Sequence, residues 1–239
     1  MTTSTTKKRI HIAPQDRGHT EIDWLNSYHS FSFGDYYNPE SMEFGSLRVI
    51  NDDVIKASSG FGLHGHRDME IITIILRGAV EHQDSMGNQT IIRRGEIQRM
   101  SAGKGVQHSE FNPSSNEPLH LLQIWIKPEE AGLTPSYDQK QFEIKPGELQ
   151  LVISPNADEG SLHIHQDAKL YQAHLEIGQS VNKALTANRR YWLQVATGSI
   201  KADGIVLEAG GALGFSEIDK DLVIEAASDN AHIILFDLK

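Results

Sequence analysis

The chain has 239 residues, of which 38% are hydrophobic and 23% charged, a composition typical of globular proteins. It contains no cysteine, which excludes disulfides, thiolate metal sites and cysteine nucleophiles. The formal net charge of −10 argues against direct binding to nucleic acid, because affinity for phosphates comes mainly from Lys and Arg.

Residues 1–9 are rich in Thr and Lys and have no apolar core, so we expect a short tail rather than a secretory signal. The longest apolar run, residues 71–76, is far too short to span a membrane. Together with the absence of cysteine, these features predict a cytoplasmic protein with no membrane contact.

Alternating apolar residues, β-branched runs and Gly/Asn/Asp turns predict strands from about residue 44 onward. In the first half the predicted strands are 44–51, 70–77, 79–84, 89–93 and 119–126. The segment 127–141 contains Pro128, Gly132 and Pro135 and is typical of a linker. Strands then resume at 150–153, 162–165, 170–177, 191–195, 199–202 and 231–238. We therefore predict an all-β chain with two domains, 1–135 and 136–239.

The second half resembles a degenerate copy of the first. Both halves contain an apolar strand that ends in glycine, at Gly78 and at Gly198, followed by a hairpin and a Gly-rich corner. Ungapped alignment on these glycines, and of Gly95 on Gly210 or Gly211, replaces every candidate histidine: Ala184 stands for His64, Thr186 for His66, and Val223 or Ile224 for His108. We expect metal ligands in the N-terminal domain only.

Two short His-containing motifs carry the candidate chemistry. Residues i and i+2 of a strand share one face, so His64 and His66 present two imidazoles side by side. Further along the chain, His108 and Glu110 repeat the arrangement with an imidazole and a carboxylate. Such pairs on neighbouring strands predict one mononuclear site for iron, manganese, nickel, copper or zinc, among which ligand type alone does not choose.

Other residues compete for these roles. Glu70 is the rival carboxylate, because on a regular strand it would share a face with His64, although Glu110 is favoured by its spacing from His108. The His163/His165 pair has no second pair downstream, so a structural role is expected. His29 is either near the pocket mouth or an ordinary packed histidine, and His82 is expected to be solvated. The tryptophans, Trp125 among them, are expected in the core.

Longer motifs connect the chain to a known family. Residues 60–70 followed by Gly78 resemble the first cupin motif, and residues 95–108 resemble the second. More narrowly, the chain resembles the pirin family of bicupins over essentially its whole length, through 17–18, 24–25, 29–33, 47–53, 68–71, 82–87, 101–110, 121–126, 165–167 and 235–238. Ser101 replaces the usual cupin proline and the 103–108 gap is long, and both departures are normal for pirins.

The resemblance implies a bicupin with two β-barrel (double-stranded β-helix, jelly-roll) domains. It also implies one divalent metal per chain, with Fe(II) expected ahead of Mn, Ni, Cu, Co or Zn, bound by His64, His66, His108 and Glu110. The associated activity is flavonol (quercetin) 2,3-dioxygenase: the metal chelates the flavonol 3-hydroxyl and 4-carbonyl, O2 opens the central ring and carbon monoxide is released. Glu110 is expected to accept the hydroxyl proton.

Two other functions remain open at this point. Pirins are also known as partners of transcription factors, which implies a non-enzymatic, redox-dependent regulator that acts through a protein partner. The third possibility is a metal-dependent cupin isomerase or sensor, for which flavonol turnover is incidental. In each case a monomer is expected.

Overall fold

The computed structural model describes residues 9–239, which form two compact units. The first unit comprises residues 17–143 and 154–167; the second comprises the described part of 1–16 together with 144–153 and 168–239. Of the predicted tail, only Arg9 lies within the described residues, where it begins strand β1 (Arg9–Ile12). The remainder of that prediction falls outside them.

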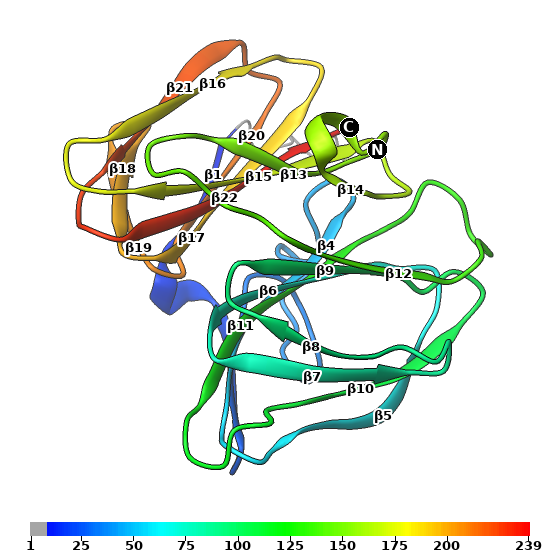
Figure 1. Ribbon diagram of the computed structural model, residues 1–239. Coiled ribbons are helices and arrows are strands. Elements are labelled where there is room, and N and C mark those ends of the chain that lie inside the picture. Colours follow the sequence, from blue (N-terminus) through cyan, green and yellow to red (C-terminus); the bar gives the residue numbers. More distant parts are fainter. Residues whose placement is uncertain (1–8) are drawn as a thin grey trace. The chain divides into compact units, whose positions relative to one another are not determined.

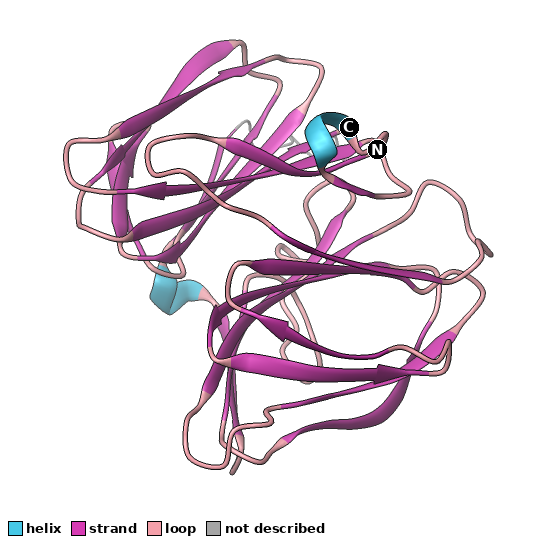
Figure 2. Cartoon of the chain, in the orientation of Figure 1, coloured by secondary structure: helices cyan, strands magenta, loops and turns pink. Residues whose placement is uncertain are grey.

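The regular elements of the described chain are almost all strands (Figure 2). The exceptions are two short 3-10 helices, η1 (Pro14–Asp16) and η2 (Asp158–Gly160). Among residues 9–239, no helix has the length and hydropathy needed to cross a membrane. The predicted all-β class is confirmed.

The first unit is a barrel built from two sheets (Figure 1). One sheet has the order β12-β9-β6-β11-β4-β3-β2 and the other β5-β10-β7-β8. Their bounds are β2 (Gly18–Glu21), β3 (Leu25–His29), β4 (Leu47–Ile55), β5 (Gly60–His66), β6 (Glu70–Arg77), β7 (Ala79–Asp84), β8 (Gln89–Arg93), β9 (Glu96–Ser101), β10 (Val106–Phe111), β11 (Leu119–Ile126) and β12 (Ser136–Gln141). The short strand β14 (Leu162–His163) also belongs to this unit.

The second unit repeats the two-sheet arrangement. Its sheets have the orders β1-β20-β17-β22-β15-β13 and β16-β21-β18-β19. The strands are β13 (Gln150–Ser154), β15 (Ala168–Leu175), β16 (Ser180–Leu185), β17 (Arg190–Thr197), β18 (Ser199–Ala202), β19 (Ile205–Glu208), β20 (Ala212–Ser216), β21 (Lys220–Ala226) and β22 (Ala231–Leu238). The predicted pair of β-barrel domains is therefore confirmed.

The two units do not coincide with the predicted ranges 1–135 and 136–239, because each includes segments from both sides of residue 135. Strand β12 pairs with β9 along its whole length, from Ser136 opposite Ser101 to Gln141 opposite Glu96, so it completes a sheet of the first unit. Strand β1 pairs with β20, so the start of the described chain lies beside the C-terminal strands (Figure 1). Backbone pairing across long sequence distances causes both differences. A linker predicted from composition gives no information about such pairing.

The interiors of the two barrels differ in polarity. The second unit is filled by one large apolar cluster, to which Leu193, Phe215 and Leu235 belong. In the first unit, the apolar clusters around Ile75 and around Met100 are smaller. They share the interior with fully buried polar side chains such as Thr73, His82, Gln98, His108 and Glu110. Burying polar groups costs free energy unless they are paired or used, so the first barrel is the candidate for function.

Strand registers identify which residues of the second unit replace the ligands. Glu110 pairs with Phe61 and His82, and the corresponding pairs in the second unit are Ile224 with Val181 and Ala202. Ile224 therefore replaces Glu110, and the buried Leu222, two residues earlier, replaces His108. The ungapped alignment of His108 on Val223 or Ile224 was wrong, because the corner before β21 is shorter than the corner before β10.

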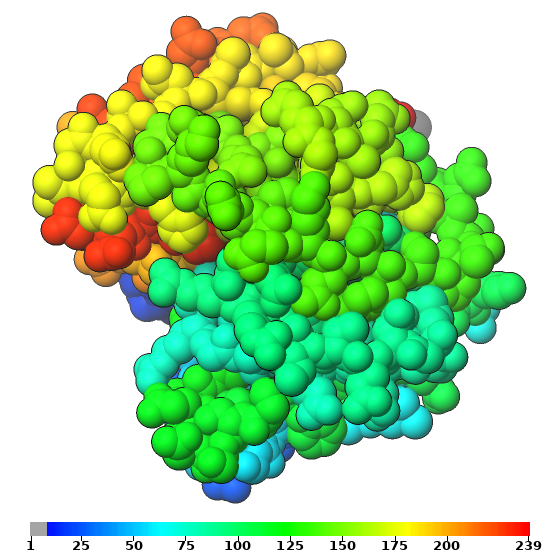
Figure 3. All heavy atoms as spheres, viewed as in Figure 1, coloured from blue at the N-terminus to red at the C-terminus, as the bar shows by residue number. Residues whose placement is uncertain are grey.

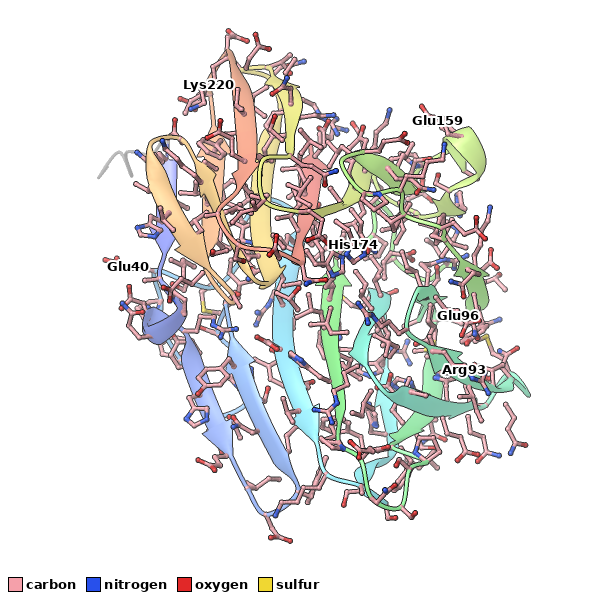
Figure 4. All side chains as sticks on the ribbon, turned by 60° about the vertical axis from the view of Figure 1, so that its left-hand side comes forward. Glu40, Arg93, Glu96, Glu159, His174 and Lys220 are labelled. Atoms are coloured by element: carbon pink, nitrogen blue, oxygen red, sulfur yellow. The ribbon has the colours of Figure 1, made fainter. Side chains whose placement is uncertain are left out.

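Side chains close over the strands of each unit in the space-filling view (Figure 3), so the spaces between the ribbons are filled. Hydrogen bonds from side chains to the backbone also fix individual turns. At the β8–β9 turn, the Glu96 carboxylate accepts a hydrogen bond from the Arg93 backbone N–H at 2.6 Å, and both residues are labelled in Figure 4. Gly95 has φ +87° between them, a conformation that glycine adopts without strain.

Candidate metal centre

Strands β5 and β10 bring the two predicted motifs together. They pair antiparallel, with His64 opposite His108 and His66 opposite Val106. The register shifts between His108 and Glu110, so that Glu110 lies opposite Phe61. This β-bulge places one more residue on β5 than on β10 and lets both Phe61 and His64 line the same pocket.

Three imidazoles converge at this place. Their ring centroids are 4.8 Å apart for His64 and His66, 4.4 Å for His64 and His108, and 4.9 Å for His66 and His108. One ligand nitrogen from each lies within 4.8 Å of the others, a spacing that a single ion can bridge. Burial, together with the neighbouring His64, lowers the pKa of His66 to about 4 and that of His108 to about 2. Both rings are therefore neutral at physiological pH, as metal ligands must be.

The free nitrogens of these rings fit a bound ion. Nδ1–H of His64 donates to the Gly62 carbonyl at 2.8 Å, which leaves Nε2 as a lone-pair donor. Nε2 of His108 is buried and has no hydrogen-bond partner within the described residues. An unpaired buried nitrogen costs free energy, and a transition-metal ion would satisfy it. The donor set therefore passes the test for a metal site.

His82 packs against His108 of this cluster, with ring centroids 5.3 Å apart, although the sequence predicted it to be solvated. That prediction was wrong, because His82 is fully buried and β7 pairs it with Glu110 on β10. Gln98 Nε2 donates to Nδ1 of His82 at 2.9 Å, and Nε2–H of His82 donates to Asp84 Oδ2 at 3.1 Å. Its pKa is lowered by burial, with Asp84 opposing.

Glu110 lies at the same pocket but beside a different neighbour. Its carboxylate oxygen groups with the ring nitrogens of His82 and His108, all within 4.8 Å of one another. Gln123 Nε2 donates to both of its oxygens, at 3.2 and 3.0 Å. Burial, reinforced by Asp53, raises the pKa of Glu110 to about 7. The carboxyl is therefore available to bind a cation or to exchange a proton.

Glu70, the rival carboxylate, lies in a separate buried network. Ser101 Oγ donates to its Oε2 at 2.9 Å, and Nδ1 of His165 lies 3.3 Å from Oε1. The premise that Glu70 continues the strand of His64 was wrong, because β5 ends at His66 and β6 begins at Glu70 in the other sheet. His165 thus has a structural partner, and its ring packs edge-on against His163 at 4.5 Å.

A pocket of about 270 Å³ adjoins the imidazoles. Aromatic side chains form part of its wall: Phe33, Phe61 and Trp125. The Trp125 ring packs edge-on against His66, with centroids 4.9 Å apart, so this tryptophan lines the pocket rather than the general core. Flat apolar walls beside a polar end are typical of sites for aromatic small molecules.

His29, left open by the sequence, also lines this pocket. It is buried, with its Nδ1 2.8 Å from Asn51 Oδ1 and its Nε2 2.9 Å from Thr20 Oγ1. Both ring nitrogens are therefore occupied, and burial lowers its pKa. His29 is a packed, neutral part of the pocket wall and has no nitrogen left to ligate an ion. Asp53 completes this polar wall and accepts a hydrogen bond from Ser27.

Comparison with known proteins agrees with both barrels. A family model described as Pirin matches residues 12–126, and one described as Quercetinase C-terminal cupin domain matches residues 151–238. A protein named quercetin 2,3-dioxygenase from Escherichia coli strain K12 is 51% identical over 224 residues, which cover 93% of this chain and 95% of that protein.

Solved structures of similar proteins match this chain over nearly its whole length. The crystal structure of YhhW from Escherichia coli has a TM-score of 0.92 and 47% identity, and covers 97% of each chain. A second structure, described as bacterial pirin YhhW in complex with nickel(II), has a TM-score of 0.91 and 47% identity, and covers 96% of this chain and 98% of that one. A quercetin 2,3-dioxygenase from Acinetobacter baumannii, 16% identical with a TM-score of 0.78, shares the fold while covering 98% of this chain and 79% of its own.

Proposed function

Because the chain belongs to the pirin family, we propose that it is a metal-dependent flavonol 2,3-dioxygenase that opens the central ring of quercetin with O2 and releases carbon monoxide. The relative named quercetin 2,3-dioxygenase supports this reaction class, since it matches 93% of the chain at 51% identity. The observation that carries the proposal is the convergence of three imidazoles at one end of an aromatic-walled pocket.

The proposed ligands are His64, His66, His108 and Glu110, which would hold one divalent ion per chain. Fe(II) is the ion expected from the family, and nickel(II) is the second candidate because a related pirin was crystallised with it. When bound, the ion supplies Lewis-acid chemistry that favours the anionic form of the flavonol 3-hydroxyl. The second unit has Leu222 and Ile224 in place of His108 and Glu110, which supports one ion per chain.

The remaining steps fall to the protein's own side chains. Phe33, Phe61 and Trp125 hold a flat ring system and exclude water from it. Glu110, buried and held by Gln123, receives the proton of the flavonol 3-hydroxyl on one carboxylate oxygen. Gln123 is itself fixed by Thr73, whose hydroxyl donates to Gln123 Oε1 at 3.3 Å.

Loss of the flavonol absorbance band under air and under nitrogen tests this proposal. The purified protein, with its metal content measured, is expected to bleach quercetin only when both metal and O2 are present. His64→Ala and His66→Ala proteins that still fold should lose the ion and the reaction together. Turnover that persists in metal-free protein, or under nitrogen, would contradict the proposal. A folded, metal-loaded protein without turnover would favour the regulatory alternative.

A further inference from the structure

Two polar side chains on strand β4, Asn51 and Asp53, each face the pocket with one polar atom that has no hydrogen-bond partner among the described residues. Asn51 and Asp53 lie two residues apart on this strand and share a face, and both line the pocket. Ser27 Oγ donates to Oδ1 of Asp53, and Nδ1–H of His29 donates to Oδ1 of Asn51 at 2.8 Å. Within the described residues, Oδ2 of Asp53 and Nδ2 of Asn51 keep their hydrogen-bonding capacity.

These two atoms reach space that a ligand can occupy. Neither is among the fully enclosed, unpaired polar atoms of residues 9–239. They also come from the seven-stranded sheet, whereas the imidazoles of His64 and His66 come from the four-stranded sheet opposite. A ligand that fills the pocket between the two sheets would therefore place one edge at His64 and His66 and the opposite edge against Asn51 and Asp53.

The chemistry of the pair selects one kind of group. Asp53 offers an acceptor and Asn51 a donor, and a hydroxyl both donates and accepts. An ammonium group cannot accept from Asn51, and an anionic group would be repelled by an ionised Asp53. The aromatic wall formed by Phe33, Phe61 and Trp125 places that hydroxyl on a ring.

We propose that Asn51 and Asp53 form a hydroxyl-recognition site that selects aromatic ligands with a phenolic hydroxyl on the side that faces β4, opposite the imidazoles of His64 and His66. The inference rests on the proposed function, because it takes the ligand to be a flavonol whose other end lies at His64 and His66. It adds a specificity determinant that the metal centre does not supply.

Neighbouring side chains orient Asn51 and Asp53 through hydrogen bonds. His29 is fixed at both ring nitrogens, by Asn51 and by Thr20, so it orients the Asn51 amide. Ser27 orients the Asp53 carboxyl in the same way. Burial raises the pKa of Asp53 to about 7, so above neutral pH its carboxylate is ionised and accepts a hydrogen bond from a ligand hydroxyl. Fixed groups of this kind lose little entropy when a ligand binds.

Binding of two flavonols under nitrogen, followed by calorimetry, tests the proposal without turnover. Quercetin carries several phenolic hydroxyls besides the 3-hydroxyl, whereas 3-hydroxyflavone carries only the 3-hydroxyl. Wild-type protein is expected to bind quercetin about tenfold more tightly than 3-hydroxyflavone, the effect of one charge-assisted hydrogen bond. In Asp53→Asn protein, an amide donor replaces the acceptor, so quercetin should lose that advantage while 3-hydroxyflavone binds as before.

Asp52→Asn is the matched control. Asp52 lies on the other face of β4, paired with Arg17 at 2.8 Å and His120 at 2.6 Å, and does not line the pocket. Its replacement should leave both affinities unchanged. Asn51→Ala provides a second variant if Asp53→Asn does not fold, and it should weaken quercetin binding only.

Equal weakening of both flavonols in Asp53→Asn protein would show a structural role and overturn the proposal. Equal affinities in the wild type, or no binding of either flavonol, would do the same. Failure of the proposed function is a separate result: hydroxyl-selective binding under nitrogen with no turnover in air leaves the recognition site intact and removes the dioxygenase. Conversely, turnover without selectivity leaves the dioxygenase and removes the site.

Discussion

Nδ1 of His82 lies 3.5 Å from Nδ1 of His108, so one buried imidazole sits behind another. His82 already donates through Nε2 to Asp84 and accepts at Nδ1 from Gln98, which fixes its tautomer. Nδ1–H of His108 shares the one lone pair of His82 Nδ1 with the Gln98 amide, and Nε2 of His108, which has no partner among the described residues, is left for an ion. Asp84 is in turn held by the Met86 and Asn88 backbone N–H groups at 2.9 and 3.1 Å.

Replacing His82 should weaken metal binding without removing a ligand. His82→Ala is expected to lower the metal affinity about 10- to 100-fold, the usual effect of losing a group that orients a ligating histidine. Competition with a chromogenic chelator measures the change. A shift in the ligand-field spectrum of the cobalt(II)-loaded variant would show that His108 has been reoriented.

His163→Ala is the control for this experiment, because His163 is half-buried and its ring contacts His165 rather than the imidazole cluster. The same chelator titration should give the wild-type curve. Unchanged metal affinity in folded His82→Ala protein would mean that His82 is not needed to orient His108.

Mutation of the two buried glutamates should have different effects, on turnover for Glu110 and on stability for Glu70. Glu110→Gln is expected to lower flavonol turnover by at least about 100-fold, because it removes the proton acceptor. Glu70→Gln should keep the metal content and lose stability instead, by about 1–3 kcal/mol, because it weakens the bonds to Ser101 and His165. Metal analysis, chemical denaturation and flavonol turnover on both variants give the comparison. Loss of metal from Glu70→Gln protein, with Glu110→Gln unaffected, would reverse the roles assigned to them.

Much of the site follows from strand periodicity. Because side chains alternate along a strand, the spacing of His64 and His66, and of His108 and Glu110, was enough to predict two converging pairs. The roles of His82 and Asp53 could not be obtained in this way. His82 reaches the site through the β7–β10 pairing and Asp53 through the opposite sheet, and neither pairing leaves a signal in local sequence.

The same limit applies to the fold. Alternation and turn residues predicted the all-β class, and similar runs in both halves predicted the repeat. The placement of β1 and β12 depends on pairing across the chain, which composition does not encode. The β-bulge on β5 is another long-range feature.

Gly60 should be needed for the close approach of β5 to β10 next to that bulge. A Cβ at this position would lie 2.2 Å from the Glu110 carbonyl oxygen and 2.6 Å from Phe111 Cα, so Gly60→Ala forces β5 away from β10. We expect a loss of about 2 kcal/mol or more in unfolding free energy. Thermal unfolding measures it, with a loss of metal affinity as the second readout.

Gly62→Ala is a matched control on the same strand, since a Cβ there has nothing within 4 Å. Its melting temperature should stay close to that of the wild type. A Gly60→Ala protein as stable as Gly62→Ala would show that the close approach of the two strands is not required.

The metal-free protein should lose stability as the pH rises toward neutrality. The pKa of Asp53 is raised from 3.8 to about 7 by burial, with Ser27 and His120 opposing and Asp52 reinforcing the shift. Between about pH 4 and 7 the unfolded chain has released this proton and the folded chain retains it, so the free energy of unfolding falls by a few kcal/mol at most and levels off above about pH 7. Urea denaturation across this range should show a shallower decline for Asp53→Asn. Parallel declines in the two proteins would place the titrating group elsewhere.

Carbon monoxide release tests the central claim most directly. Metal-free protein is reloaded with Fe(II) to a measured content, and the headspace gas is quantified while quercetin is consumed in air. We expect one ion per chain at saturation, one molecule of carbon monoxide per quercetin, and no release from the metal-free protein or from His64→Ala. Quercetin loss without carbon monoxide, or release that does not depend on the ion, would contradict it.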